Sequence, residues 1–64
     1  MELKDFRIGD RVELHPATSL WMRGARYGTV REIGRSALTV HIDLYNREIR
    51  VDPDNIARIV AIAG

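Results

Sequence analysis

Hydrophobic and polar residues alternate along several short segments of the chain, as they do in half-buried β-strands. In the first segment Val12 and Leu14 alternate with Arg11 and Glu13, so one face is apolar and the other is charged. β-Branched residues are frequent in these segments and glycines fall between them, which is typical of strands joined by turns. The pattern predicts five strands, over residues 10–15, 27–33, 37–42, 47–51 and 57–61.

Residues within and between these strands indicate local irregularities. Val30 and Ile33 are three positions apart instead of two, which predicts a bulge or a strong twist in the second strand. Asn46 suits a positive φ in the connection that follows the third strand. Asp52 and Pro53 suit the cap and the first position of a short 3₁₀ turn before the last strand.

The longest segment without alternation is residues 16–26, where we expect a polar loop. Pro16 ends the first strand, because proline has no N–H to donate to a strand ladder. In the last strand we expect Ile59 and Ala61 to face inward, with Ile56 closing one end of the core. The resulting fold class is all-β, a small barrel or sandwich of five strands.

Chain length and composition favour a binding module over an enzyme. The 64 residues allow one domain, residues 1–64, with the core in residues 6–62 and with residues 1–5 loosely held. A domain this small rarely holds an elaborate catalytic cleft, so we expect no enzymatic activity and no cofactor. The chain has no cysteine and two histidines without the spacing of a ligand set, so we expect no metal site.

Hydropathy and the first residues bear on cellular location. No apolar run approaches the roughly 20 residues that a membrane helix needs. The first residues lack the apolar core of a signal peptide. We therefore expect a cytoplasmic protein that makes no membrane contact.

Positive charge is concentrated in the middle third of the chain. The formal net charge is only +1. Residues 20–37 carry four arginines and one glutamate, a sum of +3, whereas the segments on either side each sum to −1. Nine of the ten basic residues are arginine, which binds phosphate bidentately and stacks on flat rings. The alternative interpretation is that these arginines form an ordinary solvated surface, because a GC-rich genome favours arginine codons regardless of function.

Three motifs resemble, in order, those of SH3-like barrels and KOW-type domains. Phe6-Arg-Ile-Gly-Asp-Arg-Val12 is similar to their opening, and Gly24-Ala-Arg-Tyr-Gly-Thr-Val-Arg-Glu-Ile33 to the KOW core, where a glycine precedes the strand. Val51-Asp-Pro-Asp-Asn-Ile56 resembles their ending, where a 3₁₀ turn leads into the final strand. The resemblance implies a five-stranded SH3-like barrel with a long first loop. KOW-type domains often contact RNA or protein through loop residues.

Two further resemblances concern the first half of the chain. Residues 9–30 resemble the small SH3-like subunit of photosystem I, although the longer, asparagine-rich later half of that subunit has no counterpart here. Residues 14–28, which include His-Pro-Ala-Thr and Trp-Met, look like short proteins of phages and bacteria. This likeness implies a phage or bacterial origin and brings no activity with it.

The long first loop holds the residues best suited to bind a ligand. Trp21 and Tyr27 are flat rings on which a base can stack, and nearby arginines can hold phosphates. The predicted ligand-binding residues are Trp21, Arg23, Arg26, Tyr27 and Arg35. Folding of Trp21 over the open end of the barrel as a lid is the competing interpretation. We expect Arg31 instead to share an ion pair with a nearby glutamate.

These residues support two hypotheses about function. The first is a nucleic-acid-binding module that takes single-stranded DNA or RNA in the aromatic and arginine groove. The second is a protein-interaction or assembly module, self-associating as a homo-oligomer through its C-terminal strand. The apolar run Ile59-Val-Ala-Ile-Ala63 favours the second, because only alternate residues of a strand face inward; packing under Leu3 and Phe6 is the other explanation of that run.

Overall fold

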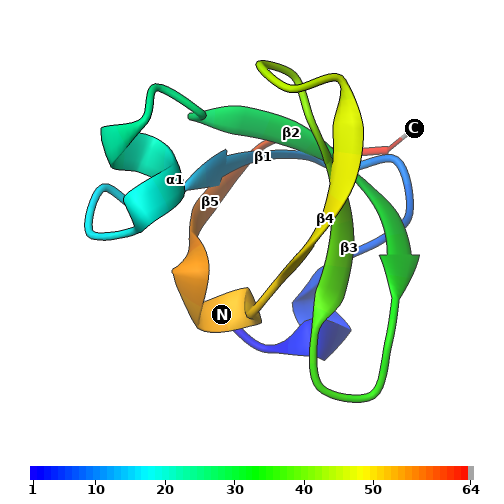
Figure 1. Ribbon diagram of the computed structural model, residues 1–64. Coiled ribbons are helices and arrows are strands. Elements are labelled where there is room, and N and C mark those ends of the chain that lie inside the picture. Colours follow the sequence, from blue (N-terminus) through cyan, green and yellow to red (C-terminus); the bar gives the residue numbers. More distant parts are fainter. Residues whose placement is uncertain (64) are drawn as a thin grey trace.

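The structure is a computed structural model that describes residues 1–63. Its strands form a five-stranded antiparallel sheet in the order β4-β3-β2-β1-β5 (Figure 1). They are β1 (Arg11–Leu14), β2 (Tyr27–Ile33), β3 (Leu38–Ile42), β4 (Arg47–Val51) and β5 (Ile56–Ala61). The all-β class is confirmed, and no predicted strand end is more than one residue from the observed end.

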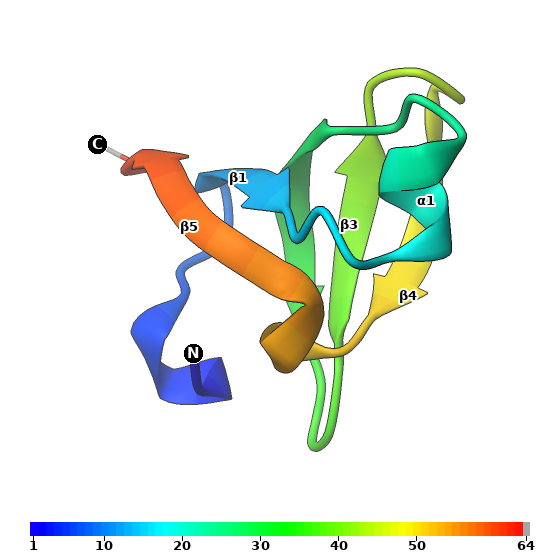
Figure 2. The same cartoon turned by 90° about the vertical axis from the view of Figure 1, so that its left-hand side faces the viewer.

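The last strand of the sheet lies beside the first. Val12 of β1 is opposite Gly28 of β2 on one side and opposite Ile59 of β5 on the other. This arrangement leaves β4 and β5 as the two edge strands, and within residues 1–63 they do not pair with each other. The sheet curves strongly, so that β5 lies on the far side of the interior from β4 (Figure 2).

Three irregularities bend the strands. In β2 the register with β3 shifts between Val30 and Glu32, so the predicted bulge is confirmed and Arg31 is its extra residue. In β5 the register with β1 shifts twice, once near Arg58 and once near Ala61. Bulges increase twist locally and are common at sheet edges. The pairing of β3 with β4 has no shift.

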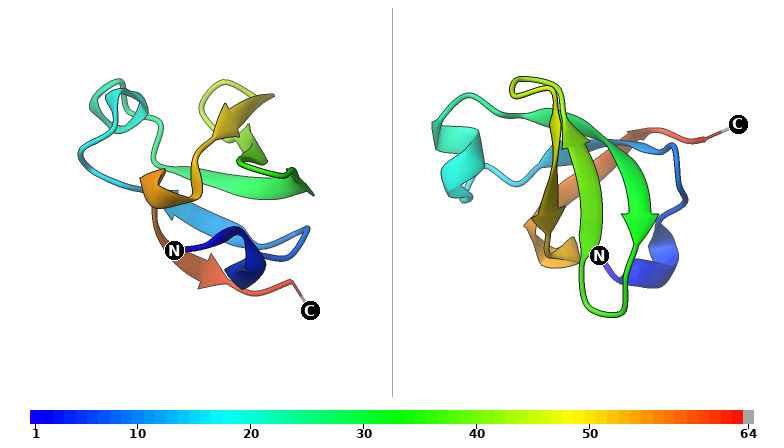
Figure 3. Two further views of the ribbon diagram at one scale, coloured as in Figure 1. Left: turned by 90° about the horizontal axis from the view of Figure 1, so that it is seen from below. Right: turned by 45° about the vertical axis from the view of Figure 1, so that its right-hand side comes forward.

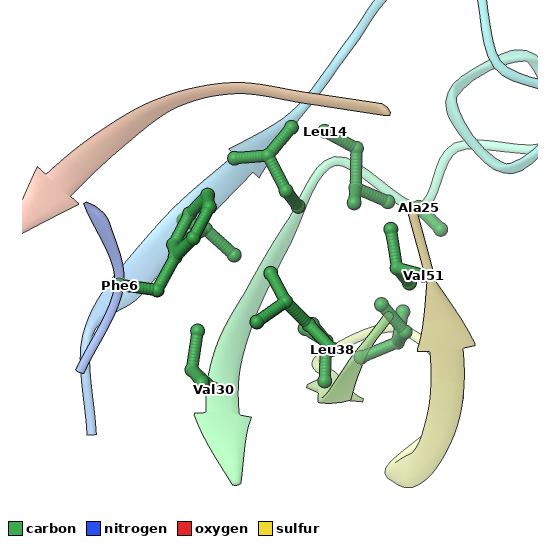
Figure 4. Packing of buried hydrophobic residues seen from close by; sticks show 10 residues of the cluster. Phe6, Leu14, Ala25, Val30, Leu38 and Val51 are labelled. Atoms are coloured by element: carbon green, nitrogen blue, oxygen red, sulfur yellow. The ribbon is translucent and has the colours of Figure 1, made fainter. Parts of the chain in front are cut away.

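The curved sheet encloses one hydrophobic core (Figure 4). The alternation predicted for β1 and β3 is confirmed, because their apolar positions are fully buried and their polar positions are not. The buried hydrophobic residues are Phe6, Val12, Leu14, Ala25, Val30, Leu38, Val40, Ile42, Val51 and Ile56. Full burial of a Val, Leu, Ile or Phe side chain stabilises the folded state by about 1.5–3 kcal/mol.

Two connections follow the predicted turn chemistry. Asn46, in the β3–β4 connection, has a φ of 51°, in the left-handed region that asparagine tolerates better than most residues. The 3₁₀ helix η2 (Pro53–Asn55) begins with Pro53, and the Asp52 carboxylate accepts a 2.9 Å hydrogen bond from the backbone N–H of Asp54. The predicted 3₁₀ turn before the last strand is therefore confirmed.

A buried carboxylate joins the start of β1 to the end of β5. Asp10 is 1% exposed. Its Oδ2 accepts a hydrogen bond from the N–H of Arg7 at 2.9 Å, and its Oδ1 accepts one from the N–H of Ala63 at 2.8 Å. The sequence pattern does not predict this role of Asp10. The N-terminal 3₁₀ helix η1 (Leu3–Asp5) lies below β5 in Figure 2, and Leu3 packs against the core.

Two details of the expected fold are wrong. The segment over residues 16–26 is not only a loop, because it contains a short helix, α1 (Ser19–Met22). Ala61 is exposed, not inward-facing, because the register shift in β5 turns it away from the core, whereas Ile59 packs against the core as expected. Within residues 1–63, none of the helices has the length and apolar character needed to span a bilayer.

Candidate functional site

Trp21 lies on α1, against the core. The Thr18 hydroxyl caps the helix by accepting a 3.2 Å hydrogen bond from the N–H of Trp21. Capping by threonine stabilises a helix of this length, which is too short to persist alone. Trp21 is half-buried and packs against the core cluster. The ring therefore has a structural contact with the core.

Arg26 covers the indole of Trp21. Its guanidinium carbon lies 4.6 Å from the ring centroid, within the range of a cation–π contact. With the core beneath it and Arg26 above it, the Trp21 ring is not an open stacking platform. A base can stack on it only if Arg26 moves. The guanidinium group has a flat face, on which a base can stack, and N–H groups, which can donate hydrogen bonds to a phosphate.

A surface hollow of about 430 Å³ lies next to Arg26. We call it the tip hollow; it is lined by Gly24, Arg26, Tyr27, Asp43 and Leu44. The N–H of Asp43 donates a 3.1 Å hydrogen bond to the carbonyl of Tyr27, which fixes the β3–β4 connection beside the start of β2. Figure 3 shows α1 and the β3–β4 connection standing apart above the sheet at this end.

The β3–β4 connection supplies a second arginine–aromatic pair that sequence analysis missed. The guanidinium carbon of Arg47 lies 5.8 Å from the ring centroid of Tyr45. Tyr45 packs against the core, as Trp21 does. Neither Arg26 nor Arg47 has a carboxylate within 4.0 Å in the described residues. Each guanidinium is thus held by a ring and keeps its charge available.

Three carboxylates near this end of the sheet already have partners: Glu13 accepts a 3.3 Å hydrogen bond from the Tyr27 hydroxyl and pairs with Arg58, and Asp43 and Glu48 are bonded as follows. Arg11 donates two hydrogen bonds to Asp43, at 2.8 and 2.6 Å, and these bonds lower the pKa of Asp43 and raise the pKa of Arg11. Glu48 accepts from Nδ1 of His41 at 2.6 Å, a contact that raises the pKa of His41. Among the residues that line the tip hollow, Asp43 is thus paired with Arg11, whereas Arg26 has no carboxylate partner in the described residues.

The predicted site residues do not form one group. Arg26 contacts Trp21 of α1 and lines the tip hollow with Tyr27, the first residue of β2, and Arg23 is the C-cap of α1. Arg35 lies in the β2–β3 turn, at the other end of a seven-residue strand that spans about 20 Å. Arg35 cannot contact a small ligand at the tip hollow and is not part of that site.

Other expectations about charged residues have mixed outcomes. Arg31 forms no ion pair within residues 1–63, neither with the neighbouring Glu32 nor with another carboxylate, so the expected pairing is wrong. The ring of His15 accepts a 3.1 Å hydrogen bond from the N–H of Ala17, so this histidine bonds to the loop backbone. The described residues hold no group of three histidine, aspartate or glutamate side chains placed to bind a metal ion.

A second hollow, of about 290 Å³, borders the free edge of β4. We call it the edge hollow. One wall is formed by the segment before and within α1, and the other by the end of β4 and by η2. The lining residues are Leu14, Ala17, Thr18, Ser19, Leu20, Arg50, Val51 and Asn55.

Comparisons with known proteins identify no family. No family model matches the chain, and no curated protein or solved structure matches it significantly.

Proposed function

We propose that the chain is a non-enzymatic module that binds single-stranded nucleic acid at one end of an SH3-like barrel. The binding surface is formed by Arg23, Arg26, Tyr27, Leu44 and Arg47, and we call it the arginine–aromatic surface. The observation that supports it most directly is that Arg26 and Arg47 are each held over an aromatic ring without a carboxylate partner within residues 1–63.

The arrangement of the strands supports the SH3-like part of this proposal. A long first connection carries α1, a regular meander runs through β2, β3 and β4, and a 3₁₀ helix leads into a last strand that pairs with the first. This layout is the one that the KOW-type resemblance implies. In such a barrel the first long connection borders the ligand groove, and here the tip hollow lies at that connection.

The chemistry of the surface suits bases and phosphates together. Tyr27 is 40% exposed and Leu44 is 56% exposed, so flat and apolar surface is accessible beside the Arg26 guanidinium. Stacking of a base on an aromatic ring is worth about 1–3 kcal/mol by alanine substitution. Unstacked bases are available only in single strands, whereas a duplex offers its phosphates alone at a surface of this kind.

A comparison of two double variants tests the proposal. Arg26→Ala with Arg47→Ala removes two charges from the arginine–aromatic surface, and Arg31→Ala with Arg35→Ala removes two charges from the bulge and the far turn. Binding of a fluorescent single-stranded DNA or RNA of about 12 nucleotides, a length within the site sizes of small modules, is followed by anisotropy. We expect the first variant to lose most of its affinity and the second to keep most of it. Equal losses would mean that only total charge matters.

An assembly module is the second candidate function. It is favoured by the free edge of β4, whose pairing with β3 is regular. The C-terminal strand β5, expected from the sequence to pair with another chain, is a poorer edge for this purpose, because its two register shifts disturb the ladder.

A further inference from the structure

β4 is an edge strand of the sheet with a regular ladder on its paired side. Its five residues pair with β3 without a register shift, and no other backbone in residues 1–63 bonds to them. In a regular antiparallel strand, alternate residues turn their N–H and C=O groups to the free side. The edge hollow borders Arg50 and Val51, and the start of α1 lies across it.

The side chains of β4 divide between the two faces of the sheet. Directly opposite residues of paired strands point to the same face. Glu48 is opposite His41 and bonds to it on the outer face, so Arg50, two positions on, also lies on that face. Ile49 and Val51 lie on the inner face, where Val51 is buried and Ile49 packs against the core.

We infer that two copies of the chain associate through β4, antiparallel, about a two-fold axis that passes next to Ile49. In this register Glu48 of each copy lies opposite Arg50 of the other, which creates two cross-strand ion pairs of opposite charge. Ile49 lies opposite its own symmetry mate. The contact is isologous, so it closes as a dimer and leaves no further β4 edge exposed.

Side-chain charge and the face on which each side chain lies favour this register over registers shifted by one or two residues. A shift of one residue would put inner-face side chains opposite outer-face ones, and strand pairing does not allow this. A shift of two residues in one direction places Glu48 opposite Glu48 of the second copy. The same shift in the other direction places Arg50 opposite Arg50. Like charges directly opposite each other destabilise a strand pair, so only the register centred on Ile49 is attractive.

Existing contacts of the outer face support the same pairing. The His41 ring already lies against Glu48 at 2.6 Å, and Arg50 donates a 3.2 Å hydrogen bond to the Ser36 hydroxyl. In the dimer, Glu48 would therefore lie between His41 of its own chain and Arg50 of the second copy. The strand is short, so the interface is at the small end of the known range, below about 1,200 Å², and the dimer is a weak one.

Charge-reversed variants test the pairing. Sedimentation of the wild-type chain from about 10 μM to 1 mM, a range that covers weak association, should show a monomer–dimer equilibrium. Glu48→Arg alone and Arg50→Glu alone should each weaken the dimer at least about tenfold, because both pairs become repulsive. A mixture of these two variants should form a heterodimer, since every pair is again of opposite sign.

A matched mixture controls for net charge. Glu32→Arg and Arg31→Glu give two chains with the same net charges as the first mixture, but these changes lie on β2, away from the free edge of β4. The inference would be overturned if this control mixture formed heterodimers preferentially, or if the first mixture did not. A wild-type chain that stays monomeric over the whole concentration range would also overturn it. Thermal unfolding of each variant shows that it is folded before it is mixed. No nucleic acid is present, so the result is independent of the proposed function.

Discussion

The guanidinium of Arg26 lies over the indole of Trp21, with 4.6 Å between the guanidinium carbon and the ring centroid. The contact links a residue outside the helix to the one aromatic residue of α1 and fixes the wall of the tip hollow. It changes the expected role of both residues. In the proposed function Trp21 supports Arg26 through this contact, and Arg26 is the residue that would present a flat charged surface to a nucleic acid.

Removal of Arg26 should expose the indole. We expect Arg26→Ala to shift Trp21 fluorescence to longer wavelength and to lower the free energy of unfolding by about 0.5–1 kcal/mol, the value of an exposed cation–π contact. Arg23→Ala, which removes the same charge from the C-cap of the same helix, should leave the emission unchanged. Fluorescence spectra and urea unfolding measure both effects, and equal spectra for the two variants would argue against the stacked arrangement.

Gly28 leaves no room for a side chain. A Cβ at this position would lie 2.6 Å from Cγ1 of Val40 and 2.7 Å from the carbonyl oxygen of His41. Gly28→Ala must therefore push β2 away from β3, and we expect it to destabilise the fold by about 1–3 kcal/mol, as overpacked cores do. Chemical denaturation measures the loss. Gly34→Ala is the comparison: its Cβ would lie 3.0 Å from a carbonyl in an exposed turn that has more freedom to adjust, so a smaller loss is expected.

The sequence predicts the strands well because their signal is local. Alternation of two residues reports directly which face is buried, and Asn46 and Pro53 mark turns by their own backbone preferences. Helix α1 has no comparable signal, since its four residues are too few to show a helical period. It is stabilised by the Thr18 cap and by contacts of Leu20 and Trp21 with a core that forms only on folding.

The candidate site is harder to predict because its residues meet across the sheet. Arg35 is near Arg26 in sequence, but the length of β2 separates them. Arg47 lies 20 positions after Tyr27, yet the hydrogen bond from Asp43 to Tyr27 brings its connection to the same end of the sheet. Only the pairing of β2 with β3 decides which arginines become neighbours.

Asp10 should be needed to hold the start of β1 beside the residues that follow β5. Asp10→Ala leaves the N–H groups of Arg7 and Ala63 without their buried acceptor, and an unsatisfied buried polar group costs about 1–3 kcal/mol. Asp10→Asn keeps one acceptor oxygen and should lose less. Hydrogen exchange at Ala63 and urea unfolding follow the two effects. Equal stability of wild type and Asp10→Ala would contradict the role assigned to this carboxylate.

His41 should make stability depend on pH. Its two ring nitrogens face Glu48 at 2.6 Å and Asn46 at 3.0 Å, and hydrogen bonding, first to Glu48 and then to Asn46, raises the pKa of His41. A raised pKa in the folded state means that protonated His41 favours folding. The contribution is fully present below the unfolded pKa of about 6.5 and is lost as the pH rises through the folded pKa.

Urea unfolding on both sides of neutrality measures this dependence. The wild-type midpoint should fall as the pH is raised from about 5.5 to 8.5, a range that brackets the ordinary histidine pKa. In His41→Gln, which has no titrating ring, this part of the decline should be absent. A decline of the same size in both proteins would show that another group is responsible.

Salt dependence tests the central claim most directly. A single-stranded oligonucleotide is titrated against the wild-type chain at about 50 and 200 mM salt, with binding read from Trp21 fluorescence and from anisotropy. If Arg23, Arg26 and Arg47 each neutralise one phosphate, the logarithm of the affinity falls by about 0.7 per phosphate per logarithm of salt, so binding weakens roughly 20-fold over this range. Binding that does not respond to salt, or no binding at the lower concentration, would contradict the account.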